Sequence, residues 1–255
     1  MESTPYCGVN ERPIESVPVP NYTEEEHGTW QLLLEKQQSL VEGRACIEFI
    51  AGLGRVQFPK TRIPRLVDVS NLIEKQTGWK LVRVEGLVHP KDFFSLLSRK
   101  LFPSTDFIRQ RSELLYTPAP DMFHDLFGHT PLLTSHDFTE FFQAFGQCGM
   151  NAYAKYPPEH DIHRMLQTIY WFTVEFGLIQ TSQGIRAYGS GSTSSPEELE
   201  FCVGPKCDRQ PFEIEKVAHQ PYDIWHLQEK VFVIESFPKL GRDFRDWART
   251  HKILS

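Results

Sequence analysis

The stretch Thr117-Pro-Ala-Pro-Asp-Met-Phe-His-Asp-Leu-Phe-Gly-His-Thr-Pro131 holds two histidines, His124 and His129, five residues apart. In an α-helix of 3.6 residues per turn, positions i and i+5 point about 140° apart. Two metal ligands at this spacing converge only if the helix ends between them. Gly128 is typical of a helix end, and Pro131 opposes continuation of the helix. The sequence therefore predicts that His124 projects from a helix and His129 from the turn after it.

A second stretch, Ile169-Tyr-Trp-Phe-Thr-Val-Glu-Phe-Gly-Leu-Ile179, sets one carboxylate, Glu175, in an apolar run. We expect a helix that begins at Asp161 and runs past Glu175. Its apolar neighbours on one face would be Trp171, Phe172, Leu178 and Ile179. A buried carboxylate is costly unless it is paired or bound to a metal. The alternative to a metal is an ion pair with Arg164, Arg186 or Lys216, and the two histidines would then simply lie near a helix end.

Two histidines and one carboxylate suit either of two metals. Non-haem Fe(II) is held this way in oxygenases, with positions left open, and zinc is held this way in metallopeptidases. The peptidase interpretation normally needs a glutamate beside the first histidine as general base. Here that residue is Asp125, and the H-E-x-x-H spacing is absent. The residues favour iron over zinc.

Composition excludes several classes of protein. The 255 residues carry a net charge of −6, which gives no support for binding nucleic acid. The five cysteines are odd in number and form no C-x-x-C, so we expect a reducing, cytoplasmic setting rather than a disulfide framework. The N-terminus does not resemble a signal peptide. No apolar run reaches the roughly 18 residues that span a bilayer, so we expect no membrane association.

The order of patterns along the chain predicts a mainly α protein with a few short β-strands, an α+β class. Residues 1–21 are proline-rich and are expected to form an extended or disordered arm, and residues 22–255 a single catalytic domain. Thr23 and Glu26 predict a capping box at the start of the first helix. Further helices are expected at 45–54, 67–77, 91–101, 137–150 and 244–251. A strand is expected at 79–84, and a strand or extended loop at 107–116.

At this point the residues carry a family resemblance. Residues 117–133 resemble the iron-binding segment of the pterin-dependent aromatic amino acid hydroxylases, and residues 168–178 resemble the segment that gives their third ligand. Arg186-Ala-Tyr-Gly-Ser-Gly191 and Val233-Ile-Glu-Ser-Phe237 are similar to later segments of the family. The resemblance runs from about Tyr22 to Phe237, and it implies a mostly helical catalytic domain with short strands.

The resemblance also implies roles for individual residues. It makes His124, His129 and Glu175 the Fe(II) ligands. It assigns Arg109 to the substrate carboxylate, where spacing alone would allow a surface ion pair. The residues in segments that line the amino acid pocket are Thr117, Pro120, Trp171, Tyr188, Ser194 and Ile224. The pterin side comprises Gly86, Leu87, Val88, Asp125 through a water, and Phe93, which would stack on the ring; by spacing alone Phe93 would be a core residue.

The implied activity is that of a monooxygenase. It uses Fe(II), a tetrahydropterin (tetrahydrobiopterin or a related pterin) and O2 as co-substrate to hydroxylate the ring of a free aromatic amino acid. By the resemblance, Trp171 occupies a site like that of the phenylalanine and tyrosine enzymes, and Ile224 occupies a position that is acidic in the tyrosine enzymes. We therefore expect L-phenylalanine to be converted to L-tyrosine. The alternatives are tryptophan hydroxylase or broad specificity, a zinc-dependent hydrolase on the same ligands, and a non-catalytic metal-binding or interaction protein.

The sequence departs from the family pattern at a few places. Asp125 and Ala119 each replace a common glutamate, and His89-Pro90 alters the pterin loop. No regulatory domain precedes residue 22, and no leucine heptad follows Phe237. The chain therefore resembles the short bacterial members, and we expect a monomer without built-in allosteric control.

Overall fold

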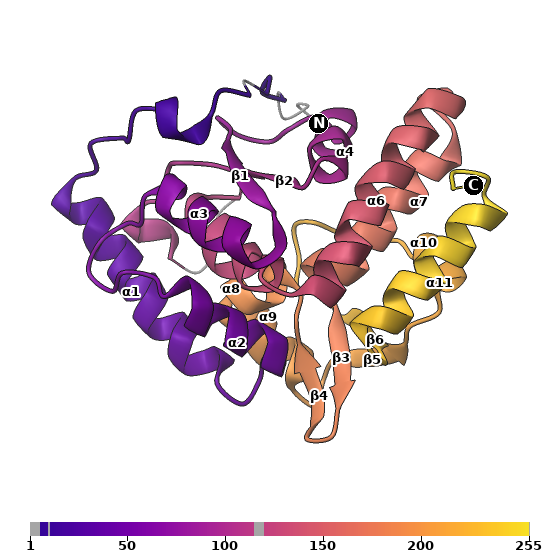
Figure 1. Cartoon of the computed structure of the whole chain (residues 1–255). Coiled ribbons are helices and arrows are strands. Elements are labelled where there is room, and N and C mark those ends of the chain that lie inside the picture. Colours follow the sequence, from indigo (N-terminus) through magenta and orange to yellow (C-terminus); the bar gives the residue numbers. More distant parts are fainter. Residues whose placement is uncertain (1–5, 10, 115–119, 255) are drawn as a thin grey trace.

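The computed structural model describes residues 6–9, 11–114 and 120–254. Figure 1 shows one side of the molecule formed by the N-terminal helices α1 (Glu24–Val41), α2 (Ile47–Val56) and α3 (Leu66–Thr77), with α4 (Pro90–Ser98) at the top of the view. The other side is formed by α6 (His136–Lys155), α7 (Asp161–Tyr170), α10 (Ile214–Ala218) and α11 (Phe237–Thr250). The expected class, mainly α with a few short strands, is confirmed. Within the described ranges, none of the helices has both the length and the apolar character that crossing a bilayer requires.

Helix α1 begins where its capping residues predicted. The Thr23 hydroxyl accepts from the Glu26 backbone N–H, and the Glu26 carboxylate accepts from the Thr23 N–H at 2.7 Å. One face of the helix then packs inward at helical spacing, through Trp30, Leu33, Leu34, Gln37 and Val41. The Gln37 amide donates to the Thr193 carbonyl at 2.7 Å, so α1 is bonded to helix α8 (Ser190–Ser194) at the centre of the fold.

Two strands form a small parallel sheet beside α3 and α4. Strand β1 (Lys80–Arg83) confirms the strand expected at 79–84, and it pairs with β2 (Leu101–Ser104), which the sequence did not reveal. The helix expected at 91–101 ends at Ser98 instead, because Lys100 adopts a φ of 59° and turns the chain into β2. The described part of segment 107–116 contributes no strand and carries only a 3-10 turn, Arg111–Glu113.

A second sheet lies at the base of the molecule in Figure 1. Its strand order is β4 (Gly184–Ala187), β3 (Leu178–Thr181), β6 (Lys230–Ile234) and β5 (Asp208–Pro211). Strands β3 and β4 form an antiparallel hairpin, and β6 runs parallel to both β3 and β5. Helix α8 and helix α9 (Pro196–Val203) follow the hairpin and carry the chain back under α1.

Helix α6 is the aromatic centre of the core and packs against both α4 and α11. Four of its phenylalanines are buried, and Phe142 stacks on Trp79 with ring centroids 5.2 Å apart. Helix α11 begins at Phe237, earlier than the expected 244. The Ser236 hydroxyl accepts from the Lys239 N–H there, and Pro238 occupies the first turn, so these two residues cap a helix that hydrophobic spacing alone did not locate.

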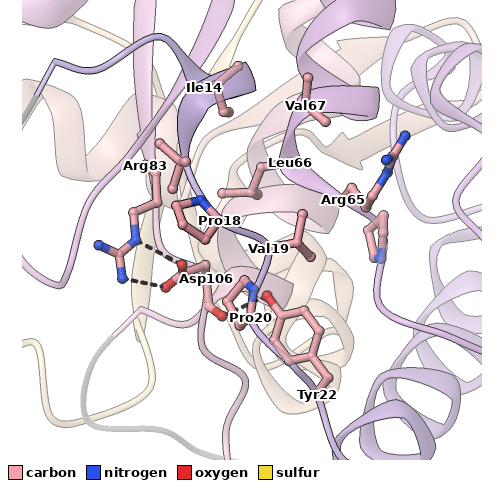
Figure 2. A pocket seen from close by; sticks show the side chains of 12 residues that line it. Ile14, Pro18, Val19, Pro20, Tyr22, Arg65, Leu66, Val67, Arg83 and Asp106 are labelled. Atoms are coloured by element: carbon pink, nitrogen blue, oxygen red, sulfur yellow. Dashed lines mark hydrogen bonds and ion pairs between the residues drawn. The ribbon is translucent and has the colours of Figure 1, made fainter.

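The described part of the N-terminal arm lies on the body of the protein. The Cys7 N–H donates to the Leu87 carbonyl at 2.9 Å, and Glu11 pairs with Arg99. Figure 2 shows a shallow groove between arm residues 14–22 and α3, where the Tyr22 hydroxyl donates to the Asp106 carbonyl at 2.8 Å. None of the residues that line this groove is among the expected site residues.

Close packing of α2 against α5 (Thr130–Leu133) gives a test of the fold. A Cβ built on Gly52 would lie 2.1 Å from the Pro131 carbonyl oxygen, a backbone atom that cannot swing away. We expect Gly52→Ala to lower the free energy of unfolding by about 3 kcal/mol, because the two helices must separate. Denaturant unfolding measures the change.

Gly54→Ala is the matched control, since Gly54 lies in the same helix and nothing stands within 4 Å of its Cβ position. It should stabilise the protein by about 0.5–1 kcal/mol, because alanine favours the helix. Equal effects of the two substitutions would contradict the close approach of α2 and α5.

Candidate metal centre and its surroundings

Three side chains from two distant segments converge: His124, His129 and Glu175. One ligand atom from each lies within 4.8 Å of the other two. The two Nε2 atoms are 3.2 Å apart, and the Glu175 oxygens lie 3.6 Å from His124 Nε2 and 3.4 Å from His129 Nε2. Ligands about 2.1 Å from one ion and at right angles to each other are separated by about 3 Å. The triangle therefore suits a single ion bound on one face, with its other positions open.

The histidine segment does not end a helix at Gly128, so that expectation was wrong. Residues His124–His129 form a π-helix, and α5 continues directly from it with Pro131 in its first turn. In a π-helix the backbone bonds join i to i+5, so residues five apart lie one above the other. The spacing that an α-helix cannot use is therefore the spacing that a π-helix needs. Pro131 lacks the N–H that would continue the hydrogen bonding across this junction, so the chain makes the turn with one backbone bond fewer.

Gly128 serves close packing instead. A Cβ at this position would lie 2.9 Å from the Ser190 carbonyl oxygen and 3.0 Å from the Ser190 side chain. The glycine therefore lets the histidine π-helix approach α8, which carries the hydroxyls described below.

Glu175 lies at the end of a second π-helix, Trp171–Glu175, which follows α7 directly. The expectation that the helix runs past Glu175 was wrong, because the chain leaves it at Phe176 and both Leu178 and Ile179 belong to β3. A π-turn again changes which side chains share a face, and Glu175 points toward the histidines.

Charge and hydrogen bonds favour ionised Glu175 despite its surroundings. Burial opposes ionisation, but His129, His124 and the Ser190 hydroxyl together hold the pKa of Glu175 at about 2. The alternative ion-pair partners lie elsewhere: Arg164 pairs with Asp161, Lys216 pairs with Glu213, and Arg186 bonds the Ile185 carbonyl. Burial also lowers the pKa of His124, which favours the neutral imidazole that a metal requires.

Helix α8 orients two of the three ligands. The Ser190 hydroxyl donates to Glu175 Oε2 at 2.7 Å. His124 Nδ1 lies 2.9 Å from Ser194 Oγ, and that hydroxyl donates to the Ser190 carbonyl at 2.7 Å. Because the Ser194 hydroxyl donates its proton to the Ser190 carbonyl, its oxygen accepts a hydrogen bond from His124 Nδ1–H. The lone pair of His124 Nε2 therefore faces the site. Ser194, expected in the amino acid pocket, thus contacts a ligand directly, and sequence reasoning missed Ser190.

Arg109 and Asp121 form a buried pair next to the histidines. Arg109 donates through Nε and Nη2 to the two Asp121 oxygens, each at 2.8 Å, and Asp121 is fully buried. Asp121 also accepts the backbone N–H groups of Arg109 and His124. Burial opposes its ionisation, but Arg109 holds the pKa of Asp121 below its usual range. The surface ion pair considered for Arg109 is therefore excluded. Asp121 was not among the expected site residues, because no local pattern indicates that it links Arg109 to His124.

Asp125 is hydrogen-bonded to Thr105, the residue that follows β2. Its Oδ2 accepts from the Thr105 backbone N–H at 2.8 Å and from the Thr105 hydroxyl at 2.9 Å. Burial raises the pKa of Asp125 to about 6. The residue thus ties the histidine π-helix to the end of β2.

The residues expected on the pterin side lie on the loop after β1 and on α4. Gly86, Leu87 and Val88 belong to the loop that the N-terminal arm touches, with Val88 buried and Leu87 exposed. Phe93 meets Tyr170 edge to face, with ring centroids 5.3 Å apart. Tyr170 directly precedes the π-helix of Glu175, so the structure brings α4 up to the metal centre. Tyr170 was not among the expected site residues.

The residues expected around the amino acid do not all lie together. Trp171 is half-buried and stacks on Tyr222 with centroids 4.7 Å apart, and Ile224 follows on the same loop. Pro120 is exposed beside Asp121, and Thr117 lies outside the described residues. Tyr188 is fully buried with its ring edge-on to Phe237, so it packs in the core rather than in an open pocket. The alternating pattern around it could not show which face is interior.

Known proteins of one enzyme family are similar to this chain over most of its length. Residues 7–253 match the family described as biopterin-dependent aromatic amino acid hydroxylase. The phenylalanine-4-hydroxylase of Pseudomonas aeruginosa is 38% identical over 220 residues, which cover 86% of this chain and 82% of that protein. The enzyme from Chromobacterium violaceum is 39% identical over 224 residues, 88% of this chain and 74% of that one. Its crystal structure with iron(III) and 7,8-dihydrobiopterin superposes with a TM-score of 0.85 at 37% identity, covering 92% of this chain and 86% of that chain. The chain belongs to the biopterin-dependent aromatic amino acid hydroxylase family.

The hydroxyl of Ser190 gives a test of the centre. We expect Ser190→Ala to weaken binding of a divalent metal about tenfold, because Glu175 loses the bond that orients it. Competition with a chromogenic chelator measures the affinity.

Ser192→Ala is the matched control, since Ser192 is equally buried in α8 and, among the described residues, its hydroxyl makes no hydrogen bond to the three ligands. Its metal affinity should equal that of the wild type. A Ser190→Ala protein that binds metal equally well would show that α8 does not orient Glu175.

Proposed function

We propose that the protein hydroxylates L-phenylalanine to L-tyrosine, with Fe(II), a tetrahydropterin and O2. The observation that carries the proposal is the convergence of His124, His129 and Glu175 from two π-helices in a chain of this family. Iron and the pterin, when bound, supply the oxygen-transfer chemistry, and the protein supplies the binding site, orientation and exclusion of water.

The donor set fits iron better than a hydrolytic zinc. Two imidazoles and a carboxylate on one face of an ion leave positions open for O2 and substrate. A zinc hydrolase would need a free carboxylate as general base beside the ligands. Asp125 is the candidate by sequence, but its Oδ2 accepts two hydrogen bonds from Thr105. The relative from C. violaceum was crystallised with iron(III), which supports the same metal here.

Arg109 is proposed to bind the substrate carboxylate. Asp121 engages two of the five N–H groups of a guanidinium, so a carboxylate can bind the others. The pair with Asp121 fixes the guanidinium plane before substrate arrives, which lowers the cost of ordering it on binding. Because Asp121 also accepts from the His124 N–H, the amino acid is held at a fixed position relative to the metal.

The ring is proposed to lie against Trp171, near Tyr222 and Ile224. These are apolar or aromatic surfaces, and Ile224 offers no partner for a phenol hydroxyl, which favours phenylalanine over tyrosine. A hydrophobic pocket separates similar rings only weakly. Tryptophan hydroxylation, or broad specificity, therefore remains the second candidate for this site.

The pterin is proposed to bind between the loop 86–88 and Phe93. Phe93 offers an aromatic surface half-exposed at the start of α4, and its contact with Tyr170 places that surface next to the Glu175 segment. Asp125 is proposed to reach the pterin through a water. The monomeric state and the cytoplasmic location remain predictions.

Glu175→Ala tests the metal assignment. We expect loss of tyrosine formation by at least about 1,000-fold, since two neutral imidazoles alone hold a divalent ion weakly. The measurement is a product assay on phenylalanine, tyrosine and tryptophan with Fe(II) and tetrahydropterin, alongside O2 uptake.

Glu197→Ala, at an exposed carboxylate, is the control and should retain wild-type turnover. Turnover retained in Glu175→Ala would refute the three-ligand site. Full zinc occupancy in the wild type without O2 consumption would refute the hydroxylase.

Arg109→Lys tests the carboxylate site. Lysine keeps the charge beside Asp121 but cannot bond two carboxylates in fork geometry, so we expect KM for phenylalanine to rise roughly 10- to 100-fold. KM for the pterin should change little. Arg111→Lys, on the exposed 3-10 turn nearby, should leave both constants unchanged. An unaltered KM for phenylalanine in Arg109→Lys would assign the carboxylate to another residue.

A further inference from the structure

We propose that Gln228 is a positioning residue that fixes Trp171 and the loop 219–229 as one wall of the amino acid pocket, and thereby sets which aromatic ring is accepted. The inference rests on the proposed function, because that function assigns this wall to the substrate. Gln228 stands at the end of the loop, just before β6, and its side chain is 6% exposed.

The amide of Gln228 uses its oxygen and its nitrogen on opposite sides. Its Oε1 accepts from Trp171 Nε1 at 2.9 Å. Its Nε2 donates to the carbonyls of Asp223 and His226, each at 2.8 Å. The Oε1 atom thus accepts one hydrogen bond, and both N–H groups of Nε2 donate one each, so neither N–H group is left without a partner.

This pattern permits one orientation of the amide. The indole Nε1 is a donor only, and the two loop carbonyls are acceptors only. A reversed amide would place NH2 against the indole N–H and an oxygen against two carbonyls, so every contact would be repulsive. Because Gln228 is buried, lost bonds would not be replaced by water, and each unsatisfied group would be costly. The side chain therefore determines where the Trp171 indole and the loop lie relative to each other.

The loop has little other support on its outer side. Residues 223–227 are all exposed, including Ile224 at 54% and Trp225 at 63%. Tyr222, which precedes these residues, is partly buried: it stacks on Trp171 with an interplanar angle of 19° and meets Phe172 edge to face. Within the described residues, the loop is thus held to the Trp171 segment by one stacked ring and by the Gln228 amide.

The C-terminal end of the loop, at Gln228, is attached to α9 and to the sheet. The Gln228 N–H donates to Glu198 Oε2 at 3.4 Å, which joins the residue to α9. Gln228 is followed by strand β6, which pairs with β3 and β5. The side chain therefore transmits the position of the sheet and α9 to the indole.

Trp171 opens the same π-helix that Glu175 ends. A shift of the indole would change the pocket wall at a point four residues from a metal ligand. We call the hydrogen-bonded set of Gln228, Trp171, Asp223 and His226 the Gln228 clamp. The Gln228 clamp thus sets the position of the Trp171 indole relative to the metal centre. A purely structural glutamine would stabilise the fold but leave the choice between substrates unchanged.

Two substitutions separate the halves of the clamp. Gln228→Met keeps the length of the side chain and removes all three hydrogen bonds. Gln228→Glu keeps an oxygen for the Trp171 N–H and replaces the NH2 group with an oxygen that faces the two carbonyls. Gln180→Met is the matched control, since the exposed Gln180 side chain on β3 donates to the carbonyl of its neighbour Thr181 and lies outside the loop.

The first measurement is kcat/KM for phenylalanine and for tryptophan, together with KM for the tetrahydropterin. For Gln228→Met we expect kcat/KM for phenylalanine to fall about tenfold, mainly through KM, because the wall is no longer held in one geometry. The ratio of phenylalanine to tryptophan activity should shift at least about threefold, since a looser wall discriminates less between rings. KM for the pterin should stay within about twofold, and Gln180→Met should match the wild type in all three.

The second measurement is amide hydrogen exchange of residues 219–229 in the protein without metal or pterin. Exchange in this segment should rise in Gln228→Met and in Gln228→Glu, while the rest of the chain exchanges as in the wild type. This readout does not depend on activity, and Gln228→Glu keeps the test open if the methionine variant fails to fold.

The outcomes are distinct. An unchanged substrate ratio in both variants, or unchanged exchange of the loop, overturns the role of Gln228. A wild-type protein that hydroxylates none of the three amino acids overturns the proposed function instead, and hydrogen exchange then still decides whether the clamp exists.

Discussion

Convergence of three ligands from two short helical segments is the constraint on which the rest of the structure depends. An α-helix cannot bring His124 and His129 together, and it would not end with Glu175 facing them. Both segments adopt π-helical turns at these residues, and π-turns are uncommon and occur frequently at functional sites. The surrounding structure must therefore hold each turn in place.

Helix α8 provides much of that support. It bonds Glu175 through Ser190 and His124 through Ser194, and it packs directly on the backbone of Gly128. Its Thr193 carbonyl accepts from Gln37 of α1, so the serine helix is fixed in turn by the longest N-terminal helix. Gln37 and the α8 residues Ser190, Thr193 and Ser194 are buried and hydrogen-bonded, which makes one geometry much more favourable than its alternatives.

The same turns carry the groups proposed to bind substrate. Asp121 accepts from both Arg109 and the His124 backbone, so the carboxylate site and the metal site share one aspartate. Trp171 and Glu175 share one π-helix, and Gln228 holds the indole to the outer loop. The residues proposed to bind substrate are therefore next to the metal ligands in the same short segments, and the two sites are held together without a separate domain interface.

Three local features could be predicted from the amino-acid sequence alone: the capping box at Thr23, the strand near Lys80, and the identity of the three ligands. These depend on neighbouring residues or on chemistry that few side chains can supply. Other features became visible only in the folded chain: the π-turns, strand β2, the burial of Tyr188, and the roles of Asp121, Ser190 and Gln228. Each of these depends on a partner far along the chain, such as Ser190 for Gly128 or Trp171 for Gln228, and a local pattern of hydrophobicity carries no information about such a partner.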